Sequence, residues 1–274
     1  MKVPHRTRAF TAALMLGFLS LAATSSSAAP KFSERPKIRA LTAFVLLDRA
    51  HYREQITDAL GELHKLKTAF EQAGYEVQTI RISTQPFANY TQGLSDEQTL
   101  AFFREYDALA VKEGFDASIG PAMLADTDDS HQAELLGKIL STSKTLEGTV
   151  VVAGDDGIHW NAVHAAAGIM KYLEDHTPHS QGNFSFAATA LVPPGTPFYP
   201  ASYYAGKGRE FAIGMQSANV LAEALAATAH KANAAQQAIE DALGPHARAV
   251  EAVAQRKPPQ QAGIISDSIS LRHR

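Results

Sequence analysis

The sequence contains no cysteine. This absence excludes disulfide bonds, a thiol nucleophile, a thiyl radical and any zinc or iron–sulfur site with cysteine ligands. The stability of the fold therefore depends on side-chain packing. At 274 residues the chain is long enough to bury a proper core, as one large domain or two small ones.

An excess of positive charge is also absent, because 25 Lys and Arg residues stand against 28 Asp and Glu residues. A chain with this balance is a poor partner for nucleic acids and for anionic membrane surfaces, so neither is expected. Beyond the N-terminus, no apolar run approaches the roughly 20 residues that a membrane-spanning helix needs. The mature protein is therefore expected to have no membrane segment.

The N-terminus has the composition of a secretory signal peptide. Lys2, Arg6 and Arg8 form a positive segment, an apolar run follows over 9–23, and small residues surround a cleavage position after Ala28. An uncleaved membrane anchor is the alternative, but this apolar run is short for a spanning helix. The pattern predicts a cleaved signal and a periplasmic or secreted protein.

The rest of the chain alternates between strand-like and helix-like patterns. Continuous apolar runs typical of buried parallel strands are separated by segments with helical spacing. Strands are expected at 40–47, 75–83, 115–119, 148–153, 184–191 and 211–215, and helices at 52–73, 95–113, 131–140, 158–175, 217–243 and 245–255. This alternation predicts an α/β fold with a largely parallel sheet. We expect one domain over 29–256 and a polar, disordered tail over 257–274.

Ligands of parallel sheets bind at the carboxyl ends of the strands, and three such places carry suitable side chains. The first is Arg81 with Thr84, near the end of the second predicted strand. An arginine with neighbouring hydroxyl donors suits a carboxylate or a phosphate, so both residues are substrate-binding candidates. A surface arginine beside a turn closed by Pro86 is the alternative.

The second place is the turn after the fourth predicted strand, which holds Asp155, Asp156 and His159. Carboxylates beside a histidine can transfer protons, so these three are the catalytic candidates. A structural explanation also exists, since Asp156 is a suitable helix N-cap and Gly157 relieves the turn. No metal site is predicted, because His164 is about 140° of helix rotation away from His159.

The third place is the loop 193–204, which contains four prolines and four aromatic residues. Prolines limit the conformations of the loop, and Tyr203 and Tyr204 are candidates for the wall of a substrate pocket. Structural packing is the alternative explanation for a rigid aromatic loop.

Several segments, taken in order, carry a resemblance to a known family. They are the strand 39–48, FEQAGYEVQTIRIST (70–84), DGIHW (156–160), NFSFAATALVPPGTPFYPASY (183–203) and FAIGMQSANVL (211–221). The chain resembles, over 39–255, the bacterial family called domain of unknown function 711. The resemblance implies a pyruvate formate-lyase-like α/β barrel and no established reaction or cofactor.

The resemblance also marks where this chain departs from its family. Members commonly have His where Tyr204 stands and Glu where Gln216 stands, which puts catalytic activity in question. Radical chemistry of the pyruvate formate-lyase kind would need active-site cysteines and a glycyl loop, which this sequence lacks. The family continues beyond the point near Gln255 where the match fades, so the barrel is expected to be incomplete at the C-terminus.

Two functions remain open from the sequence. The first is an exported enzyme of hydrolase or lyase type that performs acid–base chemistry on a small anionic molecule, with Arg81 orienting the substrate. The second is a non-catalytic binding protein, a degenerate paralogue of the family. The sequence indicates neither a cofactor nor an oligomeric state.

Overall fold

A computed structural model describes residues 35–206, 208–228 and 232–255, and the predicted signal peptide and tail lie outside these ranges. The strands are β1 (Lys37–Val45), β2 (Ile80–Thr84), β3 (Asp116–Pro121), β4 (Leu146–Gly154), β5 (Gly157–Ile158), β6 (Phe186–Ala190) and β7 (Glu210–Gln216). The helices are α1 (Tyr52–Gln72), α2 (Ala88–Thr91), α3 (Asp96–Glu113), α4 (His131–Thr142), α5 (Trp160–His176), α6 (Ala218–Ala226) and α7 (Ala232–Gln255), with a 3₁₀ segment at Pro178–Ser185.

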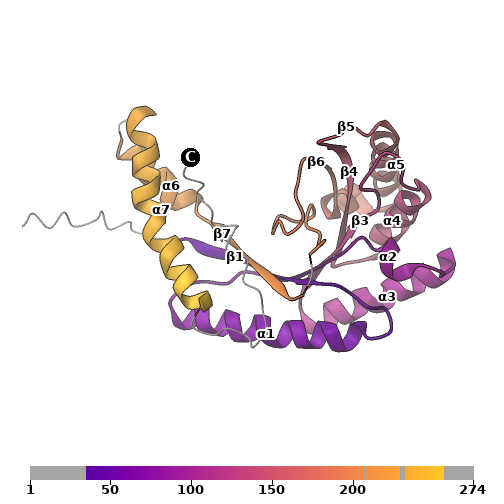
Figure 1. Cartoon of the computed structure of the whole chain (residues 1–274), viewed down its shortest axis with the longest axis horizontal. Coiled ribbons are helices and arrows are strands. Elements are labelled where there is room, and N and C mark those ends of the chain that lie inside the picture. Colours follow the sequence, from indigo (N-terminus) through magenta and orange to yellow (C-terminus); the bar gives the residue numbers. More distant parts are fainter. Residues whose placement is uncertain (1–34, 207, 229–231, 256–274) are drawn as a thin grey trace, which may run out of the picture. The chain divides into compact units, whose positions relative to one another are not determined.

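Five of the strands form a parallel sheet in the order β1, β2, β3, β4, β6. Helices connect each strand to the next, as parallel pairing requires. β7 pairs antiparallel with β1, and β5 forms a short antiparallel hairpin with the end of β4 (Figure 1). The predicted α/β fold with a largely parallel sheet is therefore confirmed.

The ends of two helices follow the sequence signals. The Ser95 side chain accepts a hydrogen bond from the Gln98 amide, and the Gln98 side chain bonds back to the Ser95 amide, so α3 begins with a capping box. Gly114 ends α3 with a φ of 75°, and Gly74 follows α1 with a φ of 83°. Both glycines supply the left-handed conformation that stops a helix at little steric cost.

Several predicted boundaries are wrong. β2 begins at Ile80 instead of at 75, because only Val77 in the segment before it pairs with β1. The predicted helix 158–175 begins at Trp160, since Ile158 belongs to β5 and His159 is the N-cap residue. The segment Pro178–Ser185 takes up the start of the strand expected at 184–191.

The predicted break near residue 244 does not occur, and α7 runs through Pro245. A proline inside a helix removes one hydrogen bond and crowds the preceding turn. Ala242 on one side of it and Val250 and Ala254 on the other are all buried. Packing on both sides of the proline stabilises the continuous helix.

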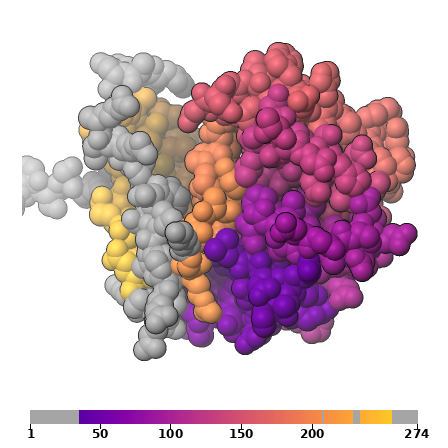
Figure 2. All heavy atoms as spheres, turned by 45° about the vertical axis from the view of Figure 1, so that its right-hand side comes forward, coloured from indigo at the N-terminus to yellow at the C-terminus, as the bar shows by residue number. Residues whose placement is uncertain are grey.

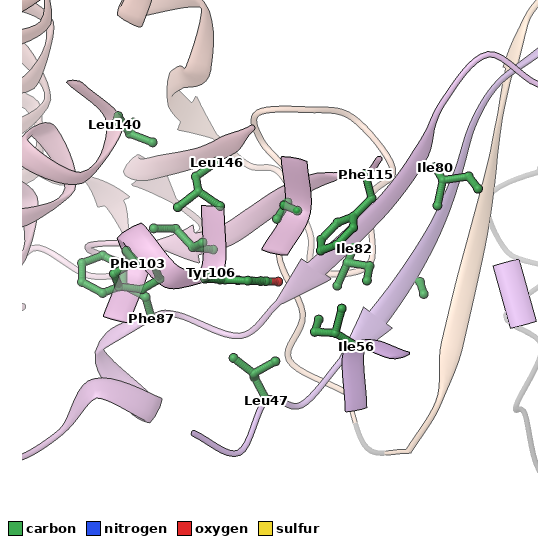
Figure 3. Packing of buried hydrophobic residues seen from close by; sticks show 14 of the residues in the cluster. Leu47, Ile56, Ile80, Ile82, Phe87, Phe103, Tyr106, Phe115, Leu140 and Leu146 are labelled. Atoms are coloured by element: carbon green, nitrogen blue, oxygen red, sulfur yellow. The ribbon is translucent and has the colours of Figure 1, made fainter. Parts of the chain in front are cut away.

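One face of the sheet packs against α1, α3, α4 and α5, and we call it the helix face. Ile82 of β2 and Phe115 lie close to Ile56 of α1 in this core (Figure 3). Phe103 and Tyr106 of α3 are fully buried among further aromatic rings. Alternate residues of a strand point to the same face, so apolar residues of several strands gather on this one.

The intervening residues of the same strands point to the other face, which we call the polar face. It is formed by Thr42, Arg81, Ser83, Asp116, Ser118, Glu147 and Thr149. The chain between β6 and β7 lies on this side of the sheet, opposite α1 and α3 (Figure 1). The space-filling view shows orange atoms of the β7 region beside indigo atoms of the start of the described chain (Figure 2). None of the helices in the described ranges is long and apolar enough to cross a membrane.

Candidate functional site

Arg81 is the central side chain of the polar face. Only 8% of the residue is exposed, and its guanidinium carbon lies 4.4 Å from the centre of the Tyr199 ring. Its Nε atom is 3.9 Å from Oδ2 of Asp116, which is too long for a hydrogen bond. Within the described residues no group hydrogen-bonds to this guanidinium, and its Nε is buried without a partner. Buried charges normally have hydrogen-bonding partners, so this one is available to a ligand.

Two carboxyl groups accompany Arg81 on the neighbouring strands. Asp116 of β3 is the register partner of Arg81, and Glu147 of β4 is the register partner of Ser118. Burial raises the pKa of Glu147 to about 7, partly offset by the positive charge of Arg81. The Oε2 atom of Glu147 is buried and has no hydrogen-bond partner within the described residues. A carboxyl group of this kind is partly protonated at neutral pH and can give or take a proton.

Burial also raises the pKa of Asp116, while the nearby charges of Arg81 and Arg39 act in the opposite direction. The side chain of Asp116 is 39% exposed, so it lies at the edge of the polar face. The cluster therefore combines a buried cation with two carboxyl groups of different exposure. Each of the three is the first or second residue of its strand, and the strands β2, β3 and β4 are consecutive in the sheet.

The loop between β6 and β7 is fastened to the polar face by hydroxyl groups. The Tyr199 hydroxyl donates to the carbonyl oxygen of Ile82, at 2.5 Å, and accepts from the amide of Ser118. The Ser202 hydroxyl bonds to the Ser83 hydroxyl at 2.8 Å. These bonds place the Tyr199 ring against the Arg81 guanidinium, where a cation–π contact replaces part of the lost hydration.

The other three predicted substrate-binding residues are packed into the fold. Thr84 is fully buried, and its hydroxyl lies 3.2 Å from the hydroxyl of Tyr90. The Tyr204 ring packs against Phe44, with ring centres 5.6 Å apart, and burial raises its pKa to about 12. The Tyr203 hydroxyl donates to a backbone carbonyl of its own loop. None of the three shares a hydrogen bond with Arg81 in the described structure.

His159 and Asp156 come together at the carboxyl end of β4. The His159 Nε2 atom lies 2.9 Å from a carboxylate oxygen of Asp156, and its Nδ1 atom lies 3.1 Å from the Val151 carbonyl oxygen. Both partners are acceptors, so the ring makes both bonds only when both nitrogens carry a proton. The hydrogen bond that His159 donates to Asp156 accordingly raises the pKa of His159, and the same bond lowers the pKa of Asp156. Asp155 is exposed and makes no side-chain hydrogen bond to the residues described.

This arrangement bears on the chemistry expected of the turn. A general base needs a free lone pair, and in this conformation neither ring nitrogen of His159 offers one. The ring is 3% exposed and ties the β4–β5 hairpin to the start of α5. The pair is thus well suited to holding the hairpin, and catalysis by His159 with Asp155 or Asp156 stays a prediction.

The part of the chain described by the structure contains no group of three or more His, Asp or Glu side chains that is arranged to hold a metal ion. The polar face has two carboxyl groups, and the β4–β5 turn has one engaged carboxylate beside one engaged imidazole.

A comparison with protein-family models matches residues 32–268 to the family described as "Uncharacterised ACR (DUF711)". The chain belongs to the DUF711 family. The match includes every residue of the polar face and of the β4–β5 turn. That description names no reaction.

A curated relative supports this assignment. The chain is 28% identical over 152 residues to a "UPF0210 protein" of Pyrobaculum islandicum (strain DSM 4184 / JCM 9189 / GEO3). The aligned segment covers 52% of this chain and 33% of the relative. The matched part of the DUF711 chain thus spans about a third of that relative's length.

Sequence reasoning singled out Arg81 but placed it near the end of its strand and missed both carboxyl groups beside it. Arg81 is in fact the second residue of β2, because the strand begins five residues later than predicted. Asp116 and Glu147 each follow a buried apolar residue at the start of a strand. A lone charge at such a position predicts a side chain pointing away from the core, and this signal could have found both residues.

Proposed function

We propose that this chain binds a small anionic molecule on the polar face, with Arg81 as the cation that receives it. The single observation behind the proposal is Arg81, a residue that is only 8% exposed and whose buried Nε atom has no hydrogen-bond partner in the described residues. Keeping a charge buried without such partners costs several kcal/mol, roughly, in folding free energy. A ligand carboxylate or phosphate would supply the missing acceptors in a planar, two-point contact.

We further propose that Glu147 moves a proton in acid–base chemistry of hydrolase or lyase type. Its pKa of about 7 gives it both protonation states near neutral pH, and its buried oxygen has no partner among the described residues. His159 with Asp155 or Asp156 is the pair that the sequence favours for this step. Glu147 is the better supported of the two, because the His159 nitrogens are both engaged.

The second candidate function is binding without catalysis. It is favoured by Tyr204, which is 1% exposed against Phe44 at a position where the family resemblance implies a His. A side chain packed in this way contributes to the fold and has no access to a ligand. On this alternative Arg81 binds the anion and Glu147 only adjusts the charge of the site.

The test is a thermal-shift screen of the full chain with phosphate, acetate, malate, citrate and L-glutamate. A probe present at 100 times its dissociation constant adds about 2.7 kcal/mol to the free energy of unfolding, which is a shift of several degrees for a domain of this size. Arg81→Lys keeps the charge but loses the planar fork, so it should reduce the shift. Arg53→Lys, at an exposed arginine of α1, is the matched control. A shift that survives Arg81→Lys and Arg81→Met, or no shift with any probe, would contradict the proposal.

Two further proposals concern the fold that the sheet belongs to and the export of the chain. We propose that the parallel strands belong to a pyruvate formate-lyase-like barrel, with which the parallel strand order and the antiparallel β7 are compatible. An experimental structure with the β6 and β7 edges joined through further strands in a longer family member would support it. We also propose export through the predicted signal peptide, which N-terminal sequencing of the mature protein would test.

A further inference from the structure

We propose that the ligand of the polar face is a small zwitterion that carries an amine as well as a carboxylate, as a free amino acid does. This inference rests on the proposed function, since it names the class of anion that Arg81 receives. It assigns the ligand carboxylate to Arg81 and the ligand amine to Glu147, with Asp116 at the edge of the same cluster.

The charges around Arg81 favour a ligand that carries a positive group as well. Two acidic side chains lie on the same side of this buried cation, Asp116 as its direct neighbour across the β2–β3 ladder and Glu147 on β4. The exposed Arg39 of β1 is a second cation whose charge acts on both carboxyl groups. A simple anion bound to Arg81 would lie close to both carboxyl groups in a region where charges are poorly screened. A ligand that also carries a positive group reverses that repulsion and converts it into attraction.

Two buried atoms of the polar face have no hydrogen-bond partner and are of opposite type. Arg81 Nε is a donor and Glu147 Oε2 is an acceptor, and both are buried without a hydrogen bond to the described residues. A ligand carboxylate satisfies the first of these atoms but bonds to Glu147 only when Glu147 is protonated, whereas an amine satisfies the ionised form of Glu147. An ammonium group has three donors and no acceptor, so it suits a carboxylate oxygen. A zwitterion satisfies both atoms with one molecule.

The Tyr199 ring has a fixed place beside the charged groups. Its hydroxyl is committed to the backbone of β2 and β3, so the ring is held in a fixed position over Arg81, with its centre 4.4 Å from the guanidinium carbon. Burial, together with the negative charge of Glu147, raises the pKa of Tyr199 well above its ordinary value. A fixed aromatic surface beside groups of opposite charge suits a small ligand whose two charges are a few bonds apart.

The test uses matched pairs of ligands on the full, unmodified chain. Isothermal titration calorimetry would compare glycine, L-alanine, L-glutamate and L-lysine with their N-acetyl derivatives, which keep the carboxylate and lose the positive charge. We expect at least one amino acid to bind about tenfold or more tightly than its N-acetyl form. Equal or tighter binding of the N-acetyl forms would overturn the zwitterion while leaving the proposed anion site intact. No binding by any member of the panel would count against both proposals.

Proton linkage gives a second, independent readout. An ammonium group beside Glu147 favours its ionised form, so a zwitterion should release protons on binding near pH 7, whereas a simple anion should take them up. Titrations in buffers of different ionisation enthalpy measure how many protons are exchanged on binding and whether they are released or taken up. Glu147→Gln should abolish the release, and Glu113→Gln, at an exposed glutamate of α3, should leave it unchanged. Proton uptake by the wild-type chain on binding an amino acid would overturn the inference.

Discussion

The two faces of the same parallel strands differ in what their side chains are bonded to. On the helix face, Ile82 and its neighbours are buried in a continuous apolar core. On the polar face, one residue away along β2, Arg81 is almost as deeply buried but has no hydrogen-bond partner in the described structure. Among the described residues, the atoms left without partners on the helix face are the neutral hydroxyls of Tyr52 and Tyr106, whereas those on the polar face include a charged donor and a carboxyl oxygen.

The difference teaches that burial alone does not separate structural residues from functional ones. Burying an apolar side chain contributes about 25 cal/mol per Å² to folding, whereas burying an unpartnered charge opposes folding. A chain retains such a charge, which lowers its stability, only where the charge has a function. Binding sites are the places where stability is most often lost in favour of function. Substitutions on the two faces should therefore have opposite signatures.

The largest expected change in the free energy of unfolding comes from a substitution in the apolar core of the helix face that leaves the polar face intact. Ile82→Ala should lower the free energy of unfolding by about 2–5 kcal/mol, because it opens a cavity in the core. Ser83→Ala, at the next residue, should cost only about 1 kcal/mol for the lost hydrogen bond to Ser202. Chemical denaturation of both variants measures the difference. Equal losses at the two positions would contradict the distinction between the faces.

The next effect is the pH dependence of the free energy of unfolding that Glu147 of the polar face adds. The folded-state pKa of Glu147, about 7, lies above its ordinary value of 4.5, so the folded state holds an extra proton between these pH values. The free energy of unfolding should therefore fall by up to about 3 kcal/mol as the pH rises from below 4.5 to above 7. Glu147→Gln should remove this contribution in denaturation curves recorded across the range, and Glu113→Gln should retain it. A Glu147→Gln profile that parallels the wild type would show that Glu147 has an ordinary pKa.

The smallest effect belongs to the β4–β5 turn, which is neither apolar core nor polar face. The raised pKa of His159 contributes stability that is present below 6.5 and is lost as the pH rises through its folded-state value. The lowered pKa of Asp156 contributes stability that is present above 3.8 and is lost as the pH falls through its folded-state value. Asp156→Asn should lower the thermal midpoint most between these limits. Asp155→Asn, one residue away and exposed, is the control, and an equal response of both variants would mean that the ion pair adds nothing.

Local sequence signals predicted most of the fold. The apolar run before Asp48, the helical spacing that Gly74 ends and the Ser95–Gln98 capping box each depend on neighbouring residues alone. The errors occur where pairing between distant segments decides, as in the late start of β2 and the antiparallel partner of β1. A sequence does not state which strand will lie beside which.

The site was predicted by residue type more than by position. Arg81 was found because an arginine near a strand end suits an anion, and His159 with Asp156 because they share a turn. Asp116 and Glu147 lie 35 and 66 residues beyond Arg81, and only the parallel register brings all three onto one face. That register is a property of the folded sheet, and no local pattern near any of the three residues encodes it.

The most direct test of the account is the stability of Arg81→Met without any ligand. Methionine fills a similar volume without a charge, so the account predicts a free energy of unfolding equal to or above that of the wild type. Urea denaturation at constant pH measures it, with Arg53→Met as the exposed control. A loss of about 3 kcal/mol or more would contradict the account, because removing one partner of a structural buried ion pair costs that much. Arg81 would then be a structural partner of Asp116 and Glu147, and the polar face would be a second core.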